Sequence, residues 1–333
     1  EPWHEPDSPR MNLNVDVILP VWRVLCDQLT KREVVGELDL GPHSHCWLLK
    51  GVESSDAAIV AWTDRTHSNA GATINMNLAD GPVTVVDAFG NTRRIQPRSQ
   101  RHRIPLDSLP RFIEDINLEL ARFRASFDIE PDFIAAEHRV HEHELVMKNP
   151  WPISVSGTIR FRERVDRRIE PRTHDFTIEP NSEVRVPLNI IVDRRILAGN
   201  QNVHATVDLL ADRKYQLKVR DAMDVGLKEI DVSVSWHVSP NPRTGRRDLV
   251  VMQRVSNTGD HPVDVECFVL SPDISQQRKP IADLMPGTTV WRSFRISDGA
   301  RRLSGRQLLA GVSHRDSVGR LNYLMKIPNL DSD

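Results

Sequence analysis

Two stretches of the chain decide its fold: HELVMKNPWPISVSGTIRF at residues 143–161 and DLVVMQRVSNTGDHPVDVECFVL at residues 248–270. In each, a strand-like run ends at an asparagine, the chain turns, and a second run returns with apolar residues at alternate positions. The asparagines, Asn149 and Asn257, are 108 residues apart. This pattern predicts two antiparallel strands joined by a turn, present twice in the chain.

The repeat extends beyond this pair of strands. FTIEPNSEVRVPLNI and IADLMPGTTVWRSFRI also correspond, with Pro180 and Pro286 106 residues apart. Gly199 and Gly305 show the same offset of 106 residues. A period of about 100 residues suits one immunoglobulin-like sandwich per copy and is too long for a solenoid repeat.

A different pattern precedes the repeat. From Val34 onward, short strand-like segments follow one another with Gly, Pro, Asn or Asp at the breaks, which predicts a further antiparallel sandwich. Apolar residues at helical spacing predict a helix within 14–32, and Pro20 favours a start near Leu19, because proline fits the first turn of a helix. We expect a second, short helix at 117–128 to link this sandwich to the repeat.

The chain is therefore expected to be mainly β: three consecutive antiparallel β-sandwiches, of which the last two are immunoglobulin-like repeats, with one N-terminal helix and one short linking helix. The polar, proline-rich residues 1–13 are expected to form a tail. The expected parts are a tail and helix at 1–32, a sandwich at 33–116, a linking helix at 117–128, and immunoglobulin-like sandwiches at 129–222 and 223–333.

Composition narrows the function classes. Lysine and arginine number 44 against 46 acidic residues, and this net charge of −2 argues against nucleic acid or an anionic membrane as the main partner. No apolar run approaches the roughly 18 residues of a membrane helix, and no signal peptide opens the chain. Without a phosphate loop, nucleophile elbow or HExxH motif, we expect neither catalytic residues nor a cofactor. Because the chain begins at Glu1 rather than Met, we expect it to be a piece of a longer protein.

The three cysteines, Cys26, Cys46 and Cys267, are too few for a disulfide framework, and their spacing fits no zinc pattern. We expect them to be small buried hydrophobic residues. A bridge between Cys26 and Cys46 is the open alternative.

Histidines give the only candidate metal ligands. In AEHRVHEHE, at 136–144, His141 and His143 are two residues apart and would share one face of a strand. With a third ligand such as Glu137 they could bind a metal ion. The alternative is a solvated face of an edge strand. His43 and His45 have the same spacing and the same two interpretations.

Tryptophans give the candidate carbohydrate contacts, because the apolar face of a sugar stacks on a flat aromatic ring. Trp62, Trp151 and Trp291 lie in or beside predicted strands, where the alternative role is core packing. Trp151 is flanked by Pro150 and Pro152 in a turn. We expect it to be the most exposed of the three, or else to pack a joint between domains.

The chain resembles a known family in several short motifs. VVGELDLG, AIVAWTD, the turn formed by Asp87, Gly90 and Asn91, and residues 110–113 are similar to the sandwich that follows the final barrel helix in glycoside hydrolases of the (β/α)₈-barrel clan. NPWPISVSG and IEPNSEVRVPLNI resemble the immunoglobulin-like modules appended to secreted bacterial glycosidases. In that family the catalytic carboxylates belong to the barrel, so the resemblance carries no catalytic residue over to this chain.

The resemblance implies a non-catalytic accessory region of a glycosidase-like protein. Such a region would pack against an upstream catalytic domain and serve as a spacer or contact polysaccharide, in an extracellular or periplasmic location. Two alternatives stay open. One is a structural or adhesive stalk of immunoglobulin-like domains that binds a protein partner, and the other is a metal-dependent hydrolase that uses His141 and His143.

Overall fold

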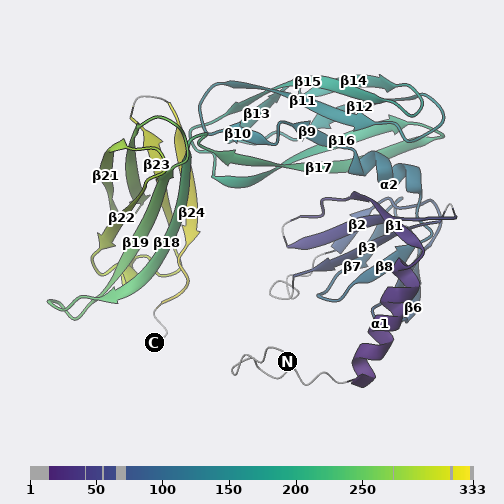
Figure 1. The fold of residues 1–333 in the computed structure, drawn as a ribbon, viewed down its shortest axis with the longest axis horizontal. Helices are drawn as coiled ribbons and strands as arrows, with labels where there is room; N and C mark the ends of the chain where they lie inside the picture. Colours follow the sequence, from purple (N-terminus) through teal and green to yellow (C-terminus); the bar gives the residue numbers. More distant parts are fainter. Residues whose placement is uncertain are drawn as a thin grey trace, which may run out of the picture.

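The computed structural model describes residues 15–41, 43–54, 56–64, 73–272, 274–315 and 318–330, so the expected tail at 1–13 lies outside the described residues. Strands dominate these residues, and most of them pair antiparallel in several sheets. The expected class, mainly β with successive antiparallel sandwiches, is confirmed. Figure 1 shows three bodies arranged as an arch, with the second across the top and the first and third both below it.

The first sandwich is built on one sheet that is covered on both faces. Its elements are α1 Val15–Leu29, β1 Arg32–Glu37, β2 Ser44–Gly51, β3 Ala57–Thr63, β4 Thr73–Met76, β5 Val83–Val86, β6 Thr92–Ile95, β7 His102–Pro105 and β8 Arg111–Glu114. The six-stranded sheet has the order β1-β2-β3-β8-β5-β6 and faces the two-stranded β4-β7. Side chains alternate along β2, so Leu48 packs with Ile74 of β4, and Leu49 packs with Val24 of α1 on the other face.

Helix α1 begins earlier than its sequence predicts. It runs from Val15 to Leu29 with Pro20 inside it, not in a first turn near Leu19. Proline removes one backbone hydrogen bond and crowds the preceding turn of a helix. Burial of Val24 against the sheet and the 3.1 Å hydrogen bond from Gln28 to Glu114 hold the helix in place and offset this local cost.

The second and third sandwiches share one topology. The second contains β9 Asp128–Glu130, β10 Phe133–Ala135, β11 Val140–Lys148, β12 Val155–Phe161, β13 Arg167–Glu170, β14 Thr173–Ile178, β15 Glu183–Val192, β16 Gly199–Leu210 and β17 Lys214–Gly226. The third contains β18 Ile230–Pro240, β19 Arg247–Asn257, β20 Val263–Ser271, β21 Ile274–Leu284, β22 Thr289–Ile296, α3 Gly299–Arg302, β23 Gln307–His314 and β24 Arg320–Lys326. Their sheet orders are β13-β15-β11-β9 with β10-β17-β16-β12-β14, and β18-β19-β22 with β21-β20-β23-β24. Seven strands correspond in both orders, as the sequence repeat predicts: β18, β19, β20, β21, β22, β23 and β24 take the places of β9, β11, β12, β14, β15, β16 and β17. Strands β10 and β13 are additional edge strands of the second sandwich.

Asn149, directly after β11, and Asn257, at the end of β19, make equivalent hydrogen bonds in the two sandwiches. Asn149 is buried, and its amide donates to the carbonyl oxygens of Ile153 and Ile178 at 2.8 and 3.0 Å. Its own side-chain oxygen accepts the backbone N–H of Trp151 at 2.9 Å. Asn257 is buried as well, and its matching partners are His261, Leu284 and Gly259. Each asparagine therefore ties a strand end, a turn and the opposite sheet together.

The turn before β15 has an equivalent before β22. Asn181 and Gly287 have φ angles of 51° and 70°, which lie in the left-handed region. Glycine and asparagine tolerate this region better than other residues. Beside them, the hydroxyl groups of Ser182 and Thr288 each donate to a carbonyl oxygen three residues back, at 2.7 and 2.6 Å. The sequence offset of 106 residues thus marks equivalent turns.

Helix α2, Leu118–Ala125, is the linking helix, and it belongs to two hydrophobic cores at once. The side chain of Asn117 caps it by accepting the backbone N–H of Leu120 at 2.7 Å. Leu118 and Ala121 are buried in the core of the first sandwich, whereas Leu120 and Phe123 are buried in the core of the second. The helix cannot swing without opening one of these cores.

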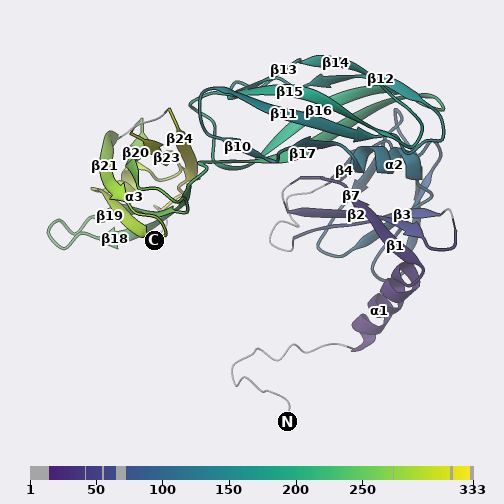
Figure 2. The same ribbon diagram turned by 45° about the horizontal axis from the view of Figure 1, so that its top comes forward.

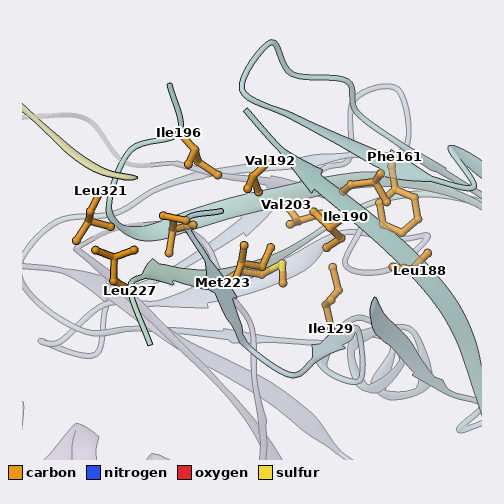
Figure 3. Packing of buried hydrophobic residues seen from close by; sticks show 14 of the residues in the cluster. Ile129, Phe161, Leu188, Ile190, Val192, Ile196, Val203, Met223, Leu227 and Leu321 are labelled. Carbon is orange, nitrogen blue, oxygen red and sulfur yellow. The ribbon is translucent and has the colours of Figure 1, made fainter. Parts of the chain in front are cut away.

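The joint between the second and third sandwiches is made by backbone pairing around Asn322 of β24. The Asn322 side chain is buried and donates to the carbonyl oxygens of Arg194 and Ile196, both at 2.9 Å. The backbone N–H of Ala198 donates to the carbonyl oxygen of Asn322 at 2.7 Å. One cluster of buried apolar residues runs through both sandwiches. Figure 3 shows its part near the joint, where Leu227 lies beside Leu321 and Ile196 lies near Val192.

We predict that Asn149→Ala and Asn257→Ala each lower the free energy of unfolding by about 2–3 kcal/mol, because each change leaves buried carbonyl groups without a donor. Urea denaturation measures this. Asn189→Ala is the matched control, since Asn189 lies exposed on β15, and it should change stability by less than about 0.5 kcal/mol. Equal effects at all three positions would contradict the role given to the repeated asparagines.

A half-buried carboxyl group lies beside the first joint. Asp221 of β17 accepts the backbone N–H groups of Ile129 and Ala222, both at 2.7 Å. Burial raises the pKa of Asp221 from 3.8 to about 6, with smaller contributions from the nearby charges of Asp128 and Asp39. The folded state therefore binds a proton here that the unfolded state releases. The resulting stabilisation is complete below pH 3.8 and is lost as the pH rises through about 6.

We predict that Asp221→Asn flattens this dependence. The difference in unfolding free energy between the variant and the wild type should move in favour of the variant as the pH rises from about 4 to about 7. Urea midpoints across this pH range provide the measurement. Asp224→Asn, an exposed position on the same strand, should leave the pH dependence unchanged, and a similar change in both variants would contradict the assignment.

Candidate functional site

Three aromatic rings meet on one face of the first sandwich, at the edge of the surface that α1 covers. Strands β2 and β3 pair so that His45 lies directly opposite Trp62, and Trp47 follows two residues along β2 on the same face. The His45 ring stacks on the Trp62 ring with centroids 5.0 Å apart, and the rings of Trp47 and Trp62 meet edge to face at 4.8 Å. Both tryptophans are half-buried, and their inner parts pack against the cluster that contains Val24.

A carboxylate completes this cluster of rings. Asp64 follows β3, and its two oxygens contact Nε2 of His45 at 2.9 Å and Nδ1 of His43 at 3.3 Å. Its backbone N–H also donates to the carbonyl oxygen of His43 at 2.8 Å. The hydrogen bond to His45 holds the pKa of Asp64 below its ordinary value, and the bond to His43 adds to this effect. Asp64 therefore stays ionised at neutral pH.

The cluster combines flat apolar surface with accessible hydrogen-bonding groups. The side chains of His43, His45 and Asp64 are 50, 40 and 42% exposed, so solvent and ligands can reach them. A ligand with apolar C–H faces and many hydroxyl groups could stack on the rings while its hydroxyls bond to the carboxylate and the imidazoles. We call His43, His45, Trp47, Trp62 and Asp64 the ring cluster.

Sequence reasoning reached only part of the ring cluster. It singled out Trp62 for carbohydrate contact and treated His43 and His45 as a separate histidine pair. It overlooked Asp64 and the meeting of these side chains. The signal was present in the spacing: His45-x-Trp47 and Trp62-x-Asp64 each place alternate residues on one face of a predicted strand. Only the pairing of the two strands brings the two faces together.

Trp151 is buried, which corrects the expectation that it would be the most exposed tryptophan. Its relative exposure is 4%, and its ring lies 5.9 Å from the ring of Phe123 in α2 and 6.4 Å from that of Tyr215. Trp151 therefore packs the joint between the first two sandwiches, which was the alternative interpretation. Because the ring is enclosed, it is not a carbohydrate contact.

Trp291 lies far from the ring cluster in sequence and stands on a different sandwich. It is 55% exposed on β22, where it lies opposite Arg254 of β19. Arg254 forms an ion pair with Asp231 at 2.9 Å. The structure thus leaves one isolated exposed tryptophan here, without a second ring beside it in the described part of the third sandwich.

His141 and His143 point inward, so they do not form the solvated edge face that was one interpretation of their pattern. Strand β11 pairs with β15 on one side and β9 on the other, and both histidines are buried. His141 Nε2 bonds to the carbonyl oxygen of Glu137 at 3.0 Å, and His143 Nδ1 bonds to that of Pro131 at 2.9 Å. Each of these nitrogens must carry the proton, because a carbonyl oxygen only accepts.

No group of three or more His, Cys, Asp or Glu side chains within the described ranges is arranged to hold a metal ion. The side chain of Glu137, the proposed third ligand, pairs instead with Arg139 at 2.7 Å. The structure therefore offers His141 and His143 no set of metal ligands. Burial lowers the pKa of His143, which favours its neutral form.

The cysteines are all free, so the alternative of a Cys26–Cys46 bridge is wrong. Cys46 and Cys267 are buried as expected, and burial raises the pKa of the Cys267 thiol to about 11. Cys26 differs from the expectation because it lies exposed on α1.

Comparison with known proteins adds little. No protein-family model and no curated protein sequence matches the chain. Solved structures that align include a red sea bream transglutaminase, with a TM-score of 0.27 at 10% identity, covering 61% of this chain and 31% of that one. A mutant α2-macroglobulin from Salmonella aligns with a TM-score of 0.29 at 11% identity, covering 89% of this chain and 24% of that one. The YadV chaperone aligns with a TM-score of 0.23 at 10% identity, covering 61% of this chain and all of that one.

TM-scores this low support no inference about fold or function. This chain spans about a third of the transglutaminase and a quarter of the macroglobulin. None of the three is a glycoside hydrolase. Separately, no helix within the described residues has both the length and the apolar character needed to cross a membrane.

Proposed function

We propose that this chain is a non-catalytic accessory region of a glycosidase-like protein and that its ring cluster contacts carbohydrate. The observation that carries the proposal is the meeting of His45, Trp47 and Trp62 beside the ionised Asp64 on an accessible face. The motif resemblance to the sandwiches that follow glycosidase barrels supports the same conclusion. An extracellular or periplasmic location follows from this proposal.

The chemistry of the ring cluster suits a sugar better than the other ligand classes considered. The C–H surface of a pyranose stacks favourably on an aromatic face, and a carboxylate accepts hydrogen bonds from two neighbouring hydroxyls. A half-exposed cluster on the surface also fits a long polysaccharide chain, which passes over a surface rather than entering a cavity. An anionic polymer would be repelled by Asp64, so we propose neutral glycans as ligands.

A second surface of the first sandwich suits the proposed packing against a catalytic domain. Helix α1 buries Val24 on the sheet but leaves Ile18, Leu19, Trp22 and Leu29 exposed. Ile18, Trp22 and Leu29 are spaced four and seven residues apart, so they form one stripe along the helix. We propose that an upstream domain of the same protein covers this stripe. The two joints would then hold the later sandwiches at a fixed place relative to that domain, as a spacer.

The alternative of a metal-dependent hydrolase has no supporting observation, because His141 and His143 are buried with no third ligand beside them among the described residues. The stalk alternative shares the α1 stripe as evidence, since an apolar stripe also suits a protein partner. It leaves the ring cluster unexplained, and we therefore rank it second.

We predict that the chain binds a neutral soluble polysaccharide, from a panel of β-glucan, xylan, mannan and starch, without releasing reducing ends. Trp62→Ala should weaken binding about tenfold or more through lost stacking. Asp64→Asn, at an exposed position that does not threaten the fold, should weaken it about threefold or more. Isothermal titration calorimetry gives the affinities, and a reducing-sugar assay tests for turnover.

Trp291→Ala is the matched control and should bind as the wild type does. Absence of binding to every polysaccharide would remove the carbohydrate-contact part of the proposal. Equal losses in Trp291→Ala and Trp62→Ala would remove the ring cluster as its location. Release of reducing ends by the purified chain would contradict the non-catalytic part.

A further inference from the structure

Strand β18 forms a long, regular edge of the third sandwich. It stands at the end of the order β18-β19-β22, so no strand pairs with its outer side among the described residues. Its pairing with β19 runs without a bulge from Ile230 opposite Asn257 to Pro240 opposite Arg247. A long unbroken edge of this kind presents backbone groups that can pair with another strand.

The backbone groups that face away from β19 can be assigned. Thr258 donates to the carbonyl oxygen of Glu229, so Glu229 and every second residue after it bond toward β19. The residues between them, Val234, Trp236 and Val238, therefore direct their N–H and C=O groups to the free side. Nearer the N-terminal end of the strand, the hydroxyl of Tyr323 donates to the carbonyl oxygen of Val232 at 2.8 Å.

The opposite side of the same sandwich shows how a protected edge looks. There, Lys279 of β21 donates to the carbonyl oxygen of Ser293 at 2.6 Å, and Arg292 of β22 donates to that of Pro280 at 3.1 Å. Charged side chains and a proline are the usual guards of an edge strand. Strand β21 also has two register shifts against β20. Strand β18, IDVSVSWHVSP, has no bulge, and its one charged residue, Asp231, and its proline, Pro240, lie near its two ends. The central residues 232–239 contain neither guard.

The inner side chains of β18 become accessible toward its far end. Ile230 and Val232 are buried in the core, but Val234, Trp236 and Val238 are only partly buried against it. An added strand would bury both the free backbone groups and this apolar row. Edge pairing and hydrophobic burial therefore favour the same event.

We propose that β18 is a self-association surface, on which β18 of a second copy of this chain pairs antiparallel around a two-fold axis at Val234. In this register Val234 lies opposite Val234 of the second copy, and the pair exchanges two backbone hydrogen bonds. Val232 lies opposite Trp236 of the second copy, an aromatic and β-branched pair of the kind that stabilises antiparallel strands. Val234 and Trp236 direct their backbone groups to the free side, so the register satisfies them. The carbonyl oxygen of Val232 already accepts the Tyr323 hydroxyl, and its second lone pair accepts the N–H of Trp236 of the second copy.

Complementary side chains, an acceptor carboxylate and a donor imidazole, favour the second copy as the occupant. In the same register, Asp231 of one chain lies opposite His237 of the other, and the two-fold axis makes this contact twice. Both side chains are exposed on the outer face of the strand. Arg254 already neutralises Asp231 in part from the neighbouring strand. A strand with Val and Ser alternating about its centre is complementary to itself, as an isologous interface requires.

The test measures dimerisation by sedimentation velocity over a wide range of protein concentration. Val234→Pro should abolish the dimer and keep the monomer folded, because the lost N–H faces away from β19 and proline is tolerated at such a position. Val234→Thr, which keeps the backbone N–H and the branched side chain, is its matched control and should retain the dimer. Circular dichroism establishes that each variant is folded.

A second variant tests the register without touching the core. His237→Asp places two carboxylates opposite each other and should weaken the dimer about tenfold or more. His261→Asp adds the same charge at an exposed position outside β18 and should have no effect. In the wild type, hydrogen exchange of the Val234 and Trp236 amides should slow as the protein concentration rises.

Three results would overturn the proposal. The wild type could stay monomeric at every concentration. A dimer could persist unchanged in Val234→Pro. A dimer could instead dissociate in Trp22→Ser, which would place the contact on the α1 stripe. A weaker dimer in the control His261→Asp would show that added negative charge alone weakens dimerisation. That result would also contradict the register.

Discussion

The buried amide of Asn322 holds together the part of the molecule that gives it its shape. A polar side chain with almost no exposed surface is tolerated only when its hydrogen bonds are made, and Asn322 makes them to Arg194 and Ile196 across the joint between two sandwiches. Separating the sandwiches would break these hydrogen bonds, which costs free energy. It would also open the apolar cluster that runs through both, near Leu227 and Leu321. The joint is therefore part of the core.

The first joint follows the same physical rule with different residues. Helix α2 contributes side chains to two cores, and Trp151 packs on Phe123 from the side of the second sandwich. Arg220 of β17 reaches back to Asp39 of the first sandwich with a 2.6 Å ion pair. These two joints connect the three sandwiches that form the arch in Figures 1 and 2. They also keep the ring cluster, the α1 stripe and the β18 edge at fixed distances from one another, which a spacer or accessory region requires.

The repeat was predictable because the same physical tasks recur in each copy. Asn149 and Asn257 appear at equivalent positions because each satisfies buried carbonyl groups. Asn181 and Gly287 likewise occupy equivalent turn positions with positive φ. The direction of the side chains in β11 was also readable. His141 and His143 share a face with Leu145 and Met147, whereas Glu142 and Glu144 occupy the other. The neighbouring glutamates favoured a solvated face for the two histidines, whereas Leu145 and Met147 on the histidine face indicate that this face is buried.

Other features depend on contacts that a linear pattern does not contain. Two prolines beside Trp151 suggested an exposed turn, yet the side chain of Asn149 accepts the Trp151 N–H and directs the ring inward. Pro20 suggested a helix start, but packing on the sheet extends the helix past it. The ring cluster required the register of β2 against β3, which brings Trp62 opposite His45. Strands and turns were predictable from local sequence patterns. Which side chains are exposed or meet on a surface depends on the pairing of segments distant in sequence.

The central claim is that the second and third sandwiches share one core through Asn322, and native-state hydrogen exchange in rising urea tests it most directly. The account predicts that amides of β11 and β19 exchange with opening free energies within about 1 kcal/mol of each other in the wild type. In Asn322→Ala, the two values should separate. Exchange of β19 at a markedly lower opening free energy in the wild type, with no further change in Asn322→Ala, would show that the sandwiches open independently and would contradict the account.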